Sequence, residues 1–201
     1  MKRQILVFLC LLALLLWAVR VINLNRETEA DIRYIEYGQE FYNGPAVVRT
    51  LQFLLLDEAA YEAQFGVVTD MGDAKKALCL QFEIRNESDA SITWDEVFAN
   101  MGDGFECKGW YSVYDPYMTA NLNVFPSEEL APGETEEFWL VTTVSKICFR
   151  DKTWEKLSDM EFEYVLSMYP DAVRIRLPKP QTECTQMEGM KPEQEQKGGT
   201  A

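Results

Sequence analysis

The stretch "ALCLQFEIRNESDASITW", residues 77–94, carries the alternation that decides the fold. Successive side chains of a strand point to opposite faces, so its first half places every second, apolar residue on one side. These residues are Leu78, Leu80, Phe82 and Ile84. The polar segment "NESDAS", residues 86–91, predicts a turn into a second strand. We therefore expect a pair of strands with one buried face.

A second stretch, "ELAPGETEEFWLV" at residues 129–141, predicts a reverse turn that leads into another strand. Pro132 sets the backbone angle of the first central position, and Gly133 supplies the positive φ of a type II turn. The strand that follows is apolar on both sides, because Trp139 and Val141 alternate with Phe138 and other core-type residues. We expect this strand to be covered on both faces.

The remaining segments are short strands with few helices between them. Strands are predicted within residues 32–56, 160–170 and 172–178, and around a hairpin-type dipeptide at Asp103-Gly104. A short helix is predicted over residues 57–66, which have a capping Asp at the start and a Gly at the end. Seven or more such strands predict a mostly β chain that forms a two-layer antiparallel sandwich with one or two short helices.

The N-terminus predicts a transmembrane helix. Residues 5–19 are all apolar, and Lys2 and Arg3 precede them. The small residues that a signal-peptide cleavage site needs are lacking, so an uncleaved signal anchor is favoured over a cleaved signal peptide. The positive N-terminal end predicts a single-pass protein of the cell membrane, with the domain on the extracytoplasmic side.

Composition divides the chain into three parts. Residues 1–26 are the signal anchor and its juncture, residues 27–178 the β-sandwich domain, and residues 179–201 a polar tail that we expect to be disordered. Residues 1–26 carry +4, and the remainder holds 15 basic against 33 acidic residues, or −18. So acidic a domain is a poor partner for nucleic acid.

The sequence contains no histidine, which removes the commonest general base and many metal sites. We predict no catalytic residue, no metal and no cofactor. The alternative is a histidine-free hydrolase with paired carboxylates, drawn from the acidic cluster Asp95, Glu96, Asp103 and Glu106. The same acids would otherwise be solvated loop residues.

Four of the five cysteines follow the apolar segment. Cys107 and Cys148 are the first candidates for a disulfide, because both lie in or near predicted strands. Free thiols are favoured over a bridge, since a domain of roughly 150 residues folds without covalent links.

Aromatic residues gather in one third of the chain. Tyr and Trp favour binding surfaces because they combine apolar area with a polar group. We expect a partner-binding surface that contains Trp110, Tyr111, Tyr114 and Tyr117, with Asp103 and Glu106 attracting the partner electrostatically. The alternative places these aromatics in the core and on sheet faces.

The order of four segments resembles bacterial extracytoplasmic immunoglobulin-like domains of unknown function, which are common in Gram-positive bacteria. These segments are "YIEYGQEF", "LQFEIRNES", the L-x-P-G-E turn at residues 130–134, and a closing "YP…IRL". The resemblance covers about residues 30–178 and implies an immunoglobulin-like fold with an accessory role at the cell surface. It brings no catalytic residues, and the N-terminus lacks the lipobox that many such domains have.

The expected function is a membrane-anchored extracytoplasmic non-catalytic binding or scaffold domain at the bacterial cell surface. The alternative is the carboxylate-dependent hydrolase, which would act on cell-surface glycan. A cell-surface protein is the expected partner, while its identity and the oligomeric state stay open.

Overall fold

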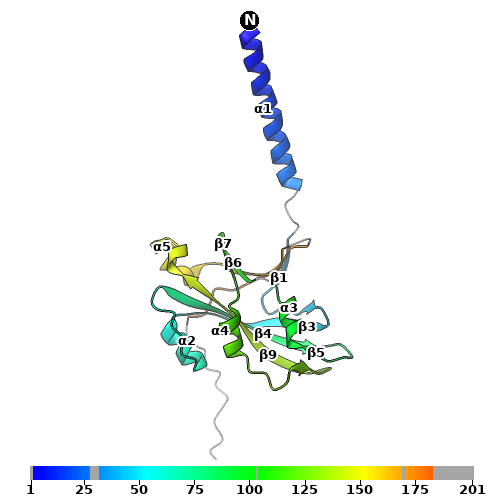
Figure 1. The fold of residues 1–201 in the computed structure, drawn as a ribbon, viewed down its shortest axis with the longest axis vertical. Coiled ribbons are helices and arrows are strands. Elements are labelled where there is room, and N and C mark those ends of the chain that lie inside the picture. Colours follow the sequence, from blue (N-terminus) through cyan, green and yellow to red (C-terminus); the bar gives the residue numbers. More distant parts are fainter. Residues whose placement is uncertain (1, 28–31, 103, 169–170, 183–201) are drawn as a thin grey trace, which may run out of the picture.

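Two β-sheets form the body of the domain in the computed structural model, which describes residues 2–27, 32–102, 104–168 and 171–182 (Figure 1). Sheet A contains, in spatial order, β1 (Arg33–Glu36), β11 (Val173–Arg176), β10 (Glu163–Ser167), β6 (Gly104–Cys107) and β7 (Trp110–Val113). Sheet B contains β2 (Phe41–Asn43), β3 (Ala46–Leu56), β4 (Lys75–Asn86) and β9 (Thr135–Ser145). Strands β5 (Ile92–Thr93) and β8 (Glu129–Leu130) form a separate small sheet. The predicted mostly β sandwich is confirmed.

Two details of the predicted sandwich are wrong. Strand β1 pairs in parallel with β11, so sheet A is mixed rather than wholly antiparallel. The strand at residues 92–94 does not pair with its neighbour in sequence, because β5 pairs with β8 while β4 pairs with β3 and β9. An immunoglobulin-like topology is not confirmed by this arrangement.

Asn86 explains why β4 does not form a hairpin with β5. Its buried side-chain amide donates to the carbonyl oxygens of Ala90 (2.8 Å) and Leu130 (2.9 Å), and its oxygen accepts from Ser88. Its backbone nitrogen donates to the Glu134 carbonyl. One buried amide therefore joins the turn after β4 to the Pro-Gly turn, two segments that the sequence shows only separately.

The domain has more helices than the predicted one or two. They are α2 (Glu58–Phe65), α3 (Trp94–Asn100), α4 (Pro116–Leu122) and α5 (Asp151–Trp154), with 3-10 turns at Lys146–Cys148 and Leu157–Asp159. Helix α2 is confirmed as predicted, since Asp57 caps its start and Gly66 ends it at φ 67°. The unpredicted α3 begins with a capping box between Thr93 and Glu96, a spacing that is visible in the sequence.

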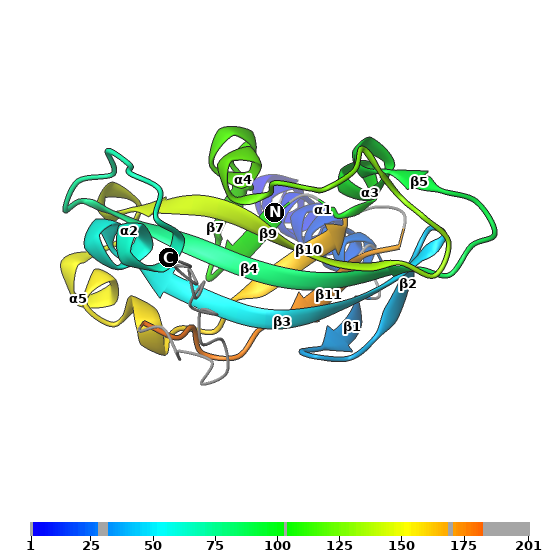
Figure 2. The ribbon, with the colours of Figure 1, turned by 90° about the horizontal axis from the view of Figure 1, so that it is seen from below.

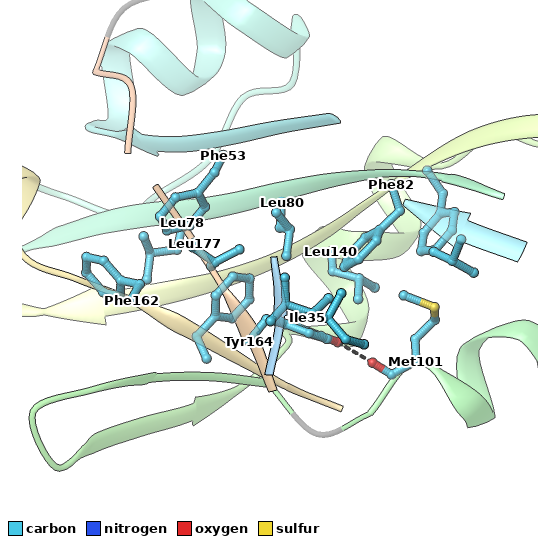
Figure 3. Packing of buried hydrophobic residues seen from close by; sticks show 14 of the residues in the cluster. Ile35, Phe53, Leu78, Leu80, Phe82, Met101, Leu140, Phe162, Tyr164 and Leu177 are labelled. Carbon is cyan, nitrogen blue, oxygen red and sulfur yellow. Dashed lines mark hydrogen bonds between the residues drawn. The ribbon is translucent and has the colours of Figure 1, made fainter. Parts of the chain in front are cut away.

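The main core lies between the two sheets (Figure 3). Apolar residues of sheet B, among them Phe53, Leu80 and Phe82, face Ile35 and Tyr164 of sheet A. The hydroxyl of Tyr164 donates to the Met101 carbonyl at 2.7 Å, so its polar end is satisfied inside the core. This packing confirms the buried face predicted for β4.

A second, smaller core lies on the outer face of sheet B, under α2 and α4 (Figure 2). Val141 is fully buried there, and Trp139 packs edge-on against Phe65 of α2, with ring centroids 5.0 Å apart. The prediction that β9 is covered on both faces is therefore confirmed.

Side chains from α4 and its C-terminal end also cover the free edge of β9. The Asn123 amide accepts from the Trp139 nitrogen and donates to the Trp139 carbonyl, both at 2.8 Å. Thr119 accepts from the Val141 nitrogen at 3.2 Å. These bonds replace a neighbouring strand, so the edge is not left open for another chain to pair with.

The folded chain extends beyond the predicted boundary at residue 178. Gln181 pairs in parallel with β3, donating to the Phe53 carbonyl and accepting from the Leu55 nitrogen, both at 2.9 Å. Residues 179–182 are therefore part of the folded domain, and the rest of the predicted tail lies outside the described residues.

Helix α1 (Lys2–Glu27) extends away from the sheets (Figure 1). Large apolar side chains are exposed along its length, including Ile5, Phe8, Leu15, Trp17 and Ile22. In the part of the chain that the structure describes, no helix is both long and apolar enough to cross a membrane, so the predicted transmembrane helix is not supported.

Candidate functional site

The predicted binding surface centres on the hairpin of β6 and β7. Its turn is Lys108-Gly109, with φ values of 46° and 84°, rather than the predicted Asp103-Gly104. Asp103 lies outside the described residues. Gly104 starts β6, where an added Cβ would lie 2.1 Å from the Ser112 carbonyl oxygen, so this glycine allows the close approach of β7.

The side chains of Trp110 and Tyr111 point to opposite faces of β7, because neighbouring residues of a strand alternate in direction. Trp110 is half-buried and packs against the core, with its ring centroid 6.0 Å from that of Phe149 and 6.4 Å from that of Phe162. Tyr111 is 38% exposed and stands opposite Glu106 on the outer face of sheet A. Both residues nevertheless border one hollow beside the hairpin turn, together with Phe149.

The other two predicted aromatics are also separated. Tyr114 is partly buried and packs against the main core. Tyr117 is 76% exposed, but it lies on α4, over the outer face of sheet B. Of the described members of the predicted set, Tyr111 pairs with Glu106 across β6 and β7 and borders one hollow with Trp110.

The outer face of sheet A, where Tyr111 and Glu106 lie, carries a network of ion pairs centred on β11. The Arg174 guanidinium contacts a Glu163 oxygen at 2.6 Å and a Glu106 oxygen at 2.9 Å. Beside it, Arg176 pairs with Glu36 at 2.9 Å and stacks over the ring of Tyr34 at 4.1 Å. The exposed Val113 lies at the β7 end of the same face. We call this surface the open face of sheet A.

The sequence did not predict Arg174, Arg176 or Tyr34 as members of a binding surface. Their alternation with Val173 and Ile175 does place the arginines on one face of a strand. The order of the strands in sheet A cannot be read from the sequence, because long-range pairing makes neighbours of β1, β11, β10, β6 and β7.

The acidic residues considered for hydrolysis have structural roles or lie apart. Glu96 accepts from the Thr93 nitrogen at 2.9 Å in the capping box, and these bonds lower its pKa. Glu106 and Glu163 face each other across β6 and β10, but Arg174 bridges them. No group of three or more potential metal ligands occurs within the described residues. The arrangement gives no specific support to the hydrolase.

The structure does not contain the candidate disulfide between Cys107 and Cys148. Cys107 and Cys148 are both free, Cys107 being buried at the end of β6 and Cys148 exposed in a 3-10 turn. Burial raises the pKa of the Cys107 thiol to about 11, so it is protonated at neutral pH.

Comparison with known proteins identifies no family. No protein-family model matches the chain, and no curated protein matches it significantly. Among solved structures, a conserved hypothetical protein from Bacillus anthracis is 12% identical, with a TM-score of 0.43 over 68% of this chain and 93% of its own. An uncharacterized beta-sandwich protein from Clostridium difficile 630 is 10% identical, with a TM-score of 0.47 over 75% and 97%. Neither description mentions a ligand or an activity.

Proposed function

We propose that this protein is a membrane-anchored, extracytoplasmic, non-catalytic binding module at the cell surface. In this proposal α1 holds the sandwich at the membrane, and the open face of sheet A binds a partner protein. The observation that carries the proposal is the unequal covering of the two sheets.

Sheet B has a buried cluster on its outer face, where α2 and α4 cover it. Among the described residues, no such cluster forms on the outer face of sheet A. That face instead combines arginines, carboxylates and the aromatic rings of Tyr34 and Tyr111. Arg and Tyr are enriched among the residues that dominate binding energy in protein interfaces.

The anchoring part of the proposal rests on the exposed apolar residues of α1. Exposed apolar side chains of this size are stabilised where lipid or protein surrounds them. Lys2 and Arg3 before the helix favour an orientation with the N-terminus inside. Five residues separate Glu27 from β1, and at about 3.5 Å each they place the start of sheet A within roughly 20 Å of the end of α1.

The binding proposal is tested by cross-linking the full chain on intact cells and identifying the captured protein. Tyr111→Ala combined with Val113→Ser should reduce capture at least tenfold if the open face is the interface. Tyr42→Ala, an exposed tyrosine on β2 of sheet B, is the matched control and should leave capture unchanged. Equal capture by the unaltered protein, the double variant and the control variant would exclude the open face of sheet A as the interface.

The anchoring proposal has a separate test. The full chain should sediment with membranes, and a chain without residues 2–27 should not. Protease added to intact cells should digest the domain. A domain that is digested only after lysis would contradict the orientation.

A further inference from the structure

An open hollow of about 610 Å³ lies beside the turn of the β6–β7 hairpin. The hairpin turn, the 3-10 turn that follows β9 and helix α5 border it. Its border contains two basic side chains, Lys108 and Arg150, and no carboxylate. A hollow beside α3 shows the opposite pattern, because Asp95, Glu128 and Glu129 border it without a base. The hollow at the hairpin turn therefore favours an anionic partner.

The bases around this hollow are available to such a partner. Within the described ranges, four exposed bases there form no ion pair: Lys108, Arg150, Lys152 and Lys156. Residues 108–111 and 146–156, which we call the basic end, hold five basic and two acidic residues. The rest of residues 27–201 holds ten basic and 31 acidic residues, because the totals there are 15 and 33. The basic end thus interrupts an otherwise strongly acidic domain.

Acidic residues near the basic end in sequence offset its charge only in part. Asp151 pairs with Lys146 at 3.4 Å, and Asp159 pairs with Lys179 at 3.0 Å. These pairs leave Glu155 and Glu161 against the four bases that form no ion pair. A positive excess therefore remains at this surface.

Aromatic and apolar side chains accompany these bases. The rings of Trp110, Phe149 and Trp154 form a row, with neighbouring centroids 6.0 and 6.4 Å apart. Lys76 lies 5.5 Å from the centroid of the Trp154 ring. Beside this row, in the 3-10 turn, Ile147 is 91% exposed. Basic residues, tryptophans and an exposed aliphatic side chain are the combination found where proteins contact the surface of a membrane.

The position of the basic end fits contact with a membrane that holds α1. In Figure 1, the β6–β7 hairpin and α5 lie on the side of the domain from which α1 extends. Five residues connect α1 to β1, and four strand spacings of about 4.8 Å separate β1 from β7 in sheet A. Each of these distances is roughly 20 Å or less, so the basic end can reach the surface of that membrane.

The net negative charge of the domain does not prevent such a contact. At physiological ionic strength the Debye length is about 8 Å, so charges on the far side of the domain are screened. The charges next to the lipid dominate, and each Lys or Arg there favours binding to an anionic leaflet by about fivefold.

We propose that the basic end docks on an anionic lipid surface, with Lys108 and Arg150 on headgroup phosphates and Ile147 inserted between the headgroups. The inference rests on the membrane location in the proposed function and adds the surface by which the domain lies against the lipid.

The test follows a fluorophore on Cys148, which is exposed and borders the hollow. The full chain carries Cys10→Ser and Cys184→Ser, so that acrylodan labels Cys148 alone in the folded protein. It is reconstituted into phosphatidylcholine vesicles with or without about one third phosphatidylglycerol. We expect the emission to shift to shorter wavelengths only where phosphatidylglycerol is present. Sodium chloride at about 1 M should reverse the shift, because the Debye length falls to about 3 Å.

Three exposed residues can be changed without disturbing the core. Lys108→Gln combined with Arg150→Gln should lower the ratio of docked to free domain roughly thirtyfold. Ile147→Ser should lower this ratio about tenfold, a loss that binding of an isolated anion would not show. All of these variants should keep the melting temperature of the unaltered protein.

Arg49→Gln combined with Arg85→Gln is the matched control. It removes the same charge from sheet B, where both arginines pair with carboxylates, and it should leave the emission shift unchanged. A loss equal to that of the Lys108 and Arg150 variant would show that only the total charge matters, which would overturn the proposal.

Two further results would overturn it. Equal emission in the two kinds of vesicle would assign the basic end to a soluble acidic partner instead. A shift produced by inorganic phosphate in phosphatidylcholine vesicles would assign the hollow to a free anion. Retention of the chain on phosphatidylcholine vesicles reports separately on α1, so a failure of the anchor is distinguished from a failure of the docking.

Discussion

The outer faces of the two sheets differ, although both belong to strands of alternating sequence. On sheet B, the outward positions hold residues such as Leu54, Cys79 and Val141, and helices bury them. On sheet A, the outward positions hold Glu106, Arg174 and other charged residues that pair with one another. Alternation alone therefore predicts a strand, while the outward residues decide whether a third layer covers the sheet.

The largest expected effect comes from placing the same charge on both faces. Val141→Lys puts an ammonium group into the fully buried cluster under α4, and we expect a loss of more than about 4 kcal/mol of unfolding free energy. Val113→Lys, at a position 58% exposed on the open face of sheet A, should change it by less than about 0.5 kcal/mol. Urea unfolding of the full chain in detergent measures both. Similar losses would mean that the two faces do not differ.

A smaller effect is expected at the edge of the covered sheet. Asn123→Ala removes the two hydrogen bonds to Trp139 and should cost about 1–3 kcal/mol. It also leaves the backbone of β9 open to pairing, so analytical ultracentrifugation should detect added self-association. Asn121→Ala, an exposed neighbour on α4, is the control and should do neither. An Asn123→Ala protein of unchanged stability would show that the edge needs no cover.

On the open face, the ion-pair network is the feature to break. Arg174→Met leaves Glu106 and Glu163 facing each other, and we expect a loss of about 1–2 kcal/mol, since all three side chains are less than one third exposed. Adding Glu106→Gln should recover part of that loss in thermal unfolding. If Arg174→Met and Glu106→Gln changed the unfolding free energy by strictly additive amounts, the ion pair between these residues would contribute nothing to stability.

Thiol labelling compares the accessibility of buried and exposed cysteines without any substitution. Cys79 lies buried on the covered face of sheet B, and burial raises its pKa. At pH 8 iodoacetamide should label the exposed Cys148 rapidly and reach Cys79 and Cys107 only after unfolding. Mass spectrometry of digested protein reads each site. A bridged Cys107 and Cys148 would be resistant until reduced, and would restore the candidate disulfide.

Much of the fold follows from local patterns in the sequence. The strands, helix α2 with its Asp57 and Gly66 ends, and the two covered faces of β9 are all predicted by alternation and capping. The pairing of β4 with a strand at residues 92–94 is not correct, because the buried Asn86 binds Leu130, which is 44 residues away. A sequence pattern of short range contains no information on such a contact.

The candidate site is predicted less well, for the same physical reason. Richness in aromatics shows that Trp110, Tyr114 and Tyr117 occur close together in the chain, but Trp110 and Tyr114 pack against the main core while α4 carries Tyr117 over the outer face of sheet B. The ion pairs of Arg174 have no local signature in the sequence either, because Glu106 and Glu163 lie on other strands.

The parallel pairing of β1 with β11 has a consequence for how the chain acquires its structure. Residues 33–36 must wait for residues 173–176, whereas β2, β3, β4 and β9 are complete by residue 145. During synthesis, sheet B can therefore assemble while the edge of sheet A still lacks its partner. Long-range pairing of this kind slows folding and prolongs the exposure of apolar surface. The first strand to emerge is among the last to be secured, which makes this the interval in which the chain most needs protection from proteases and from other unfolded copies.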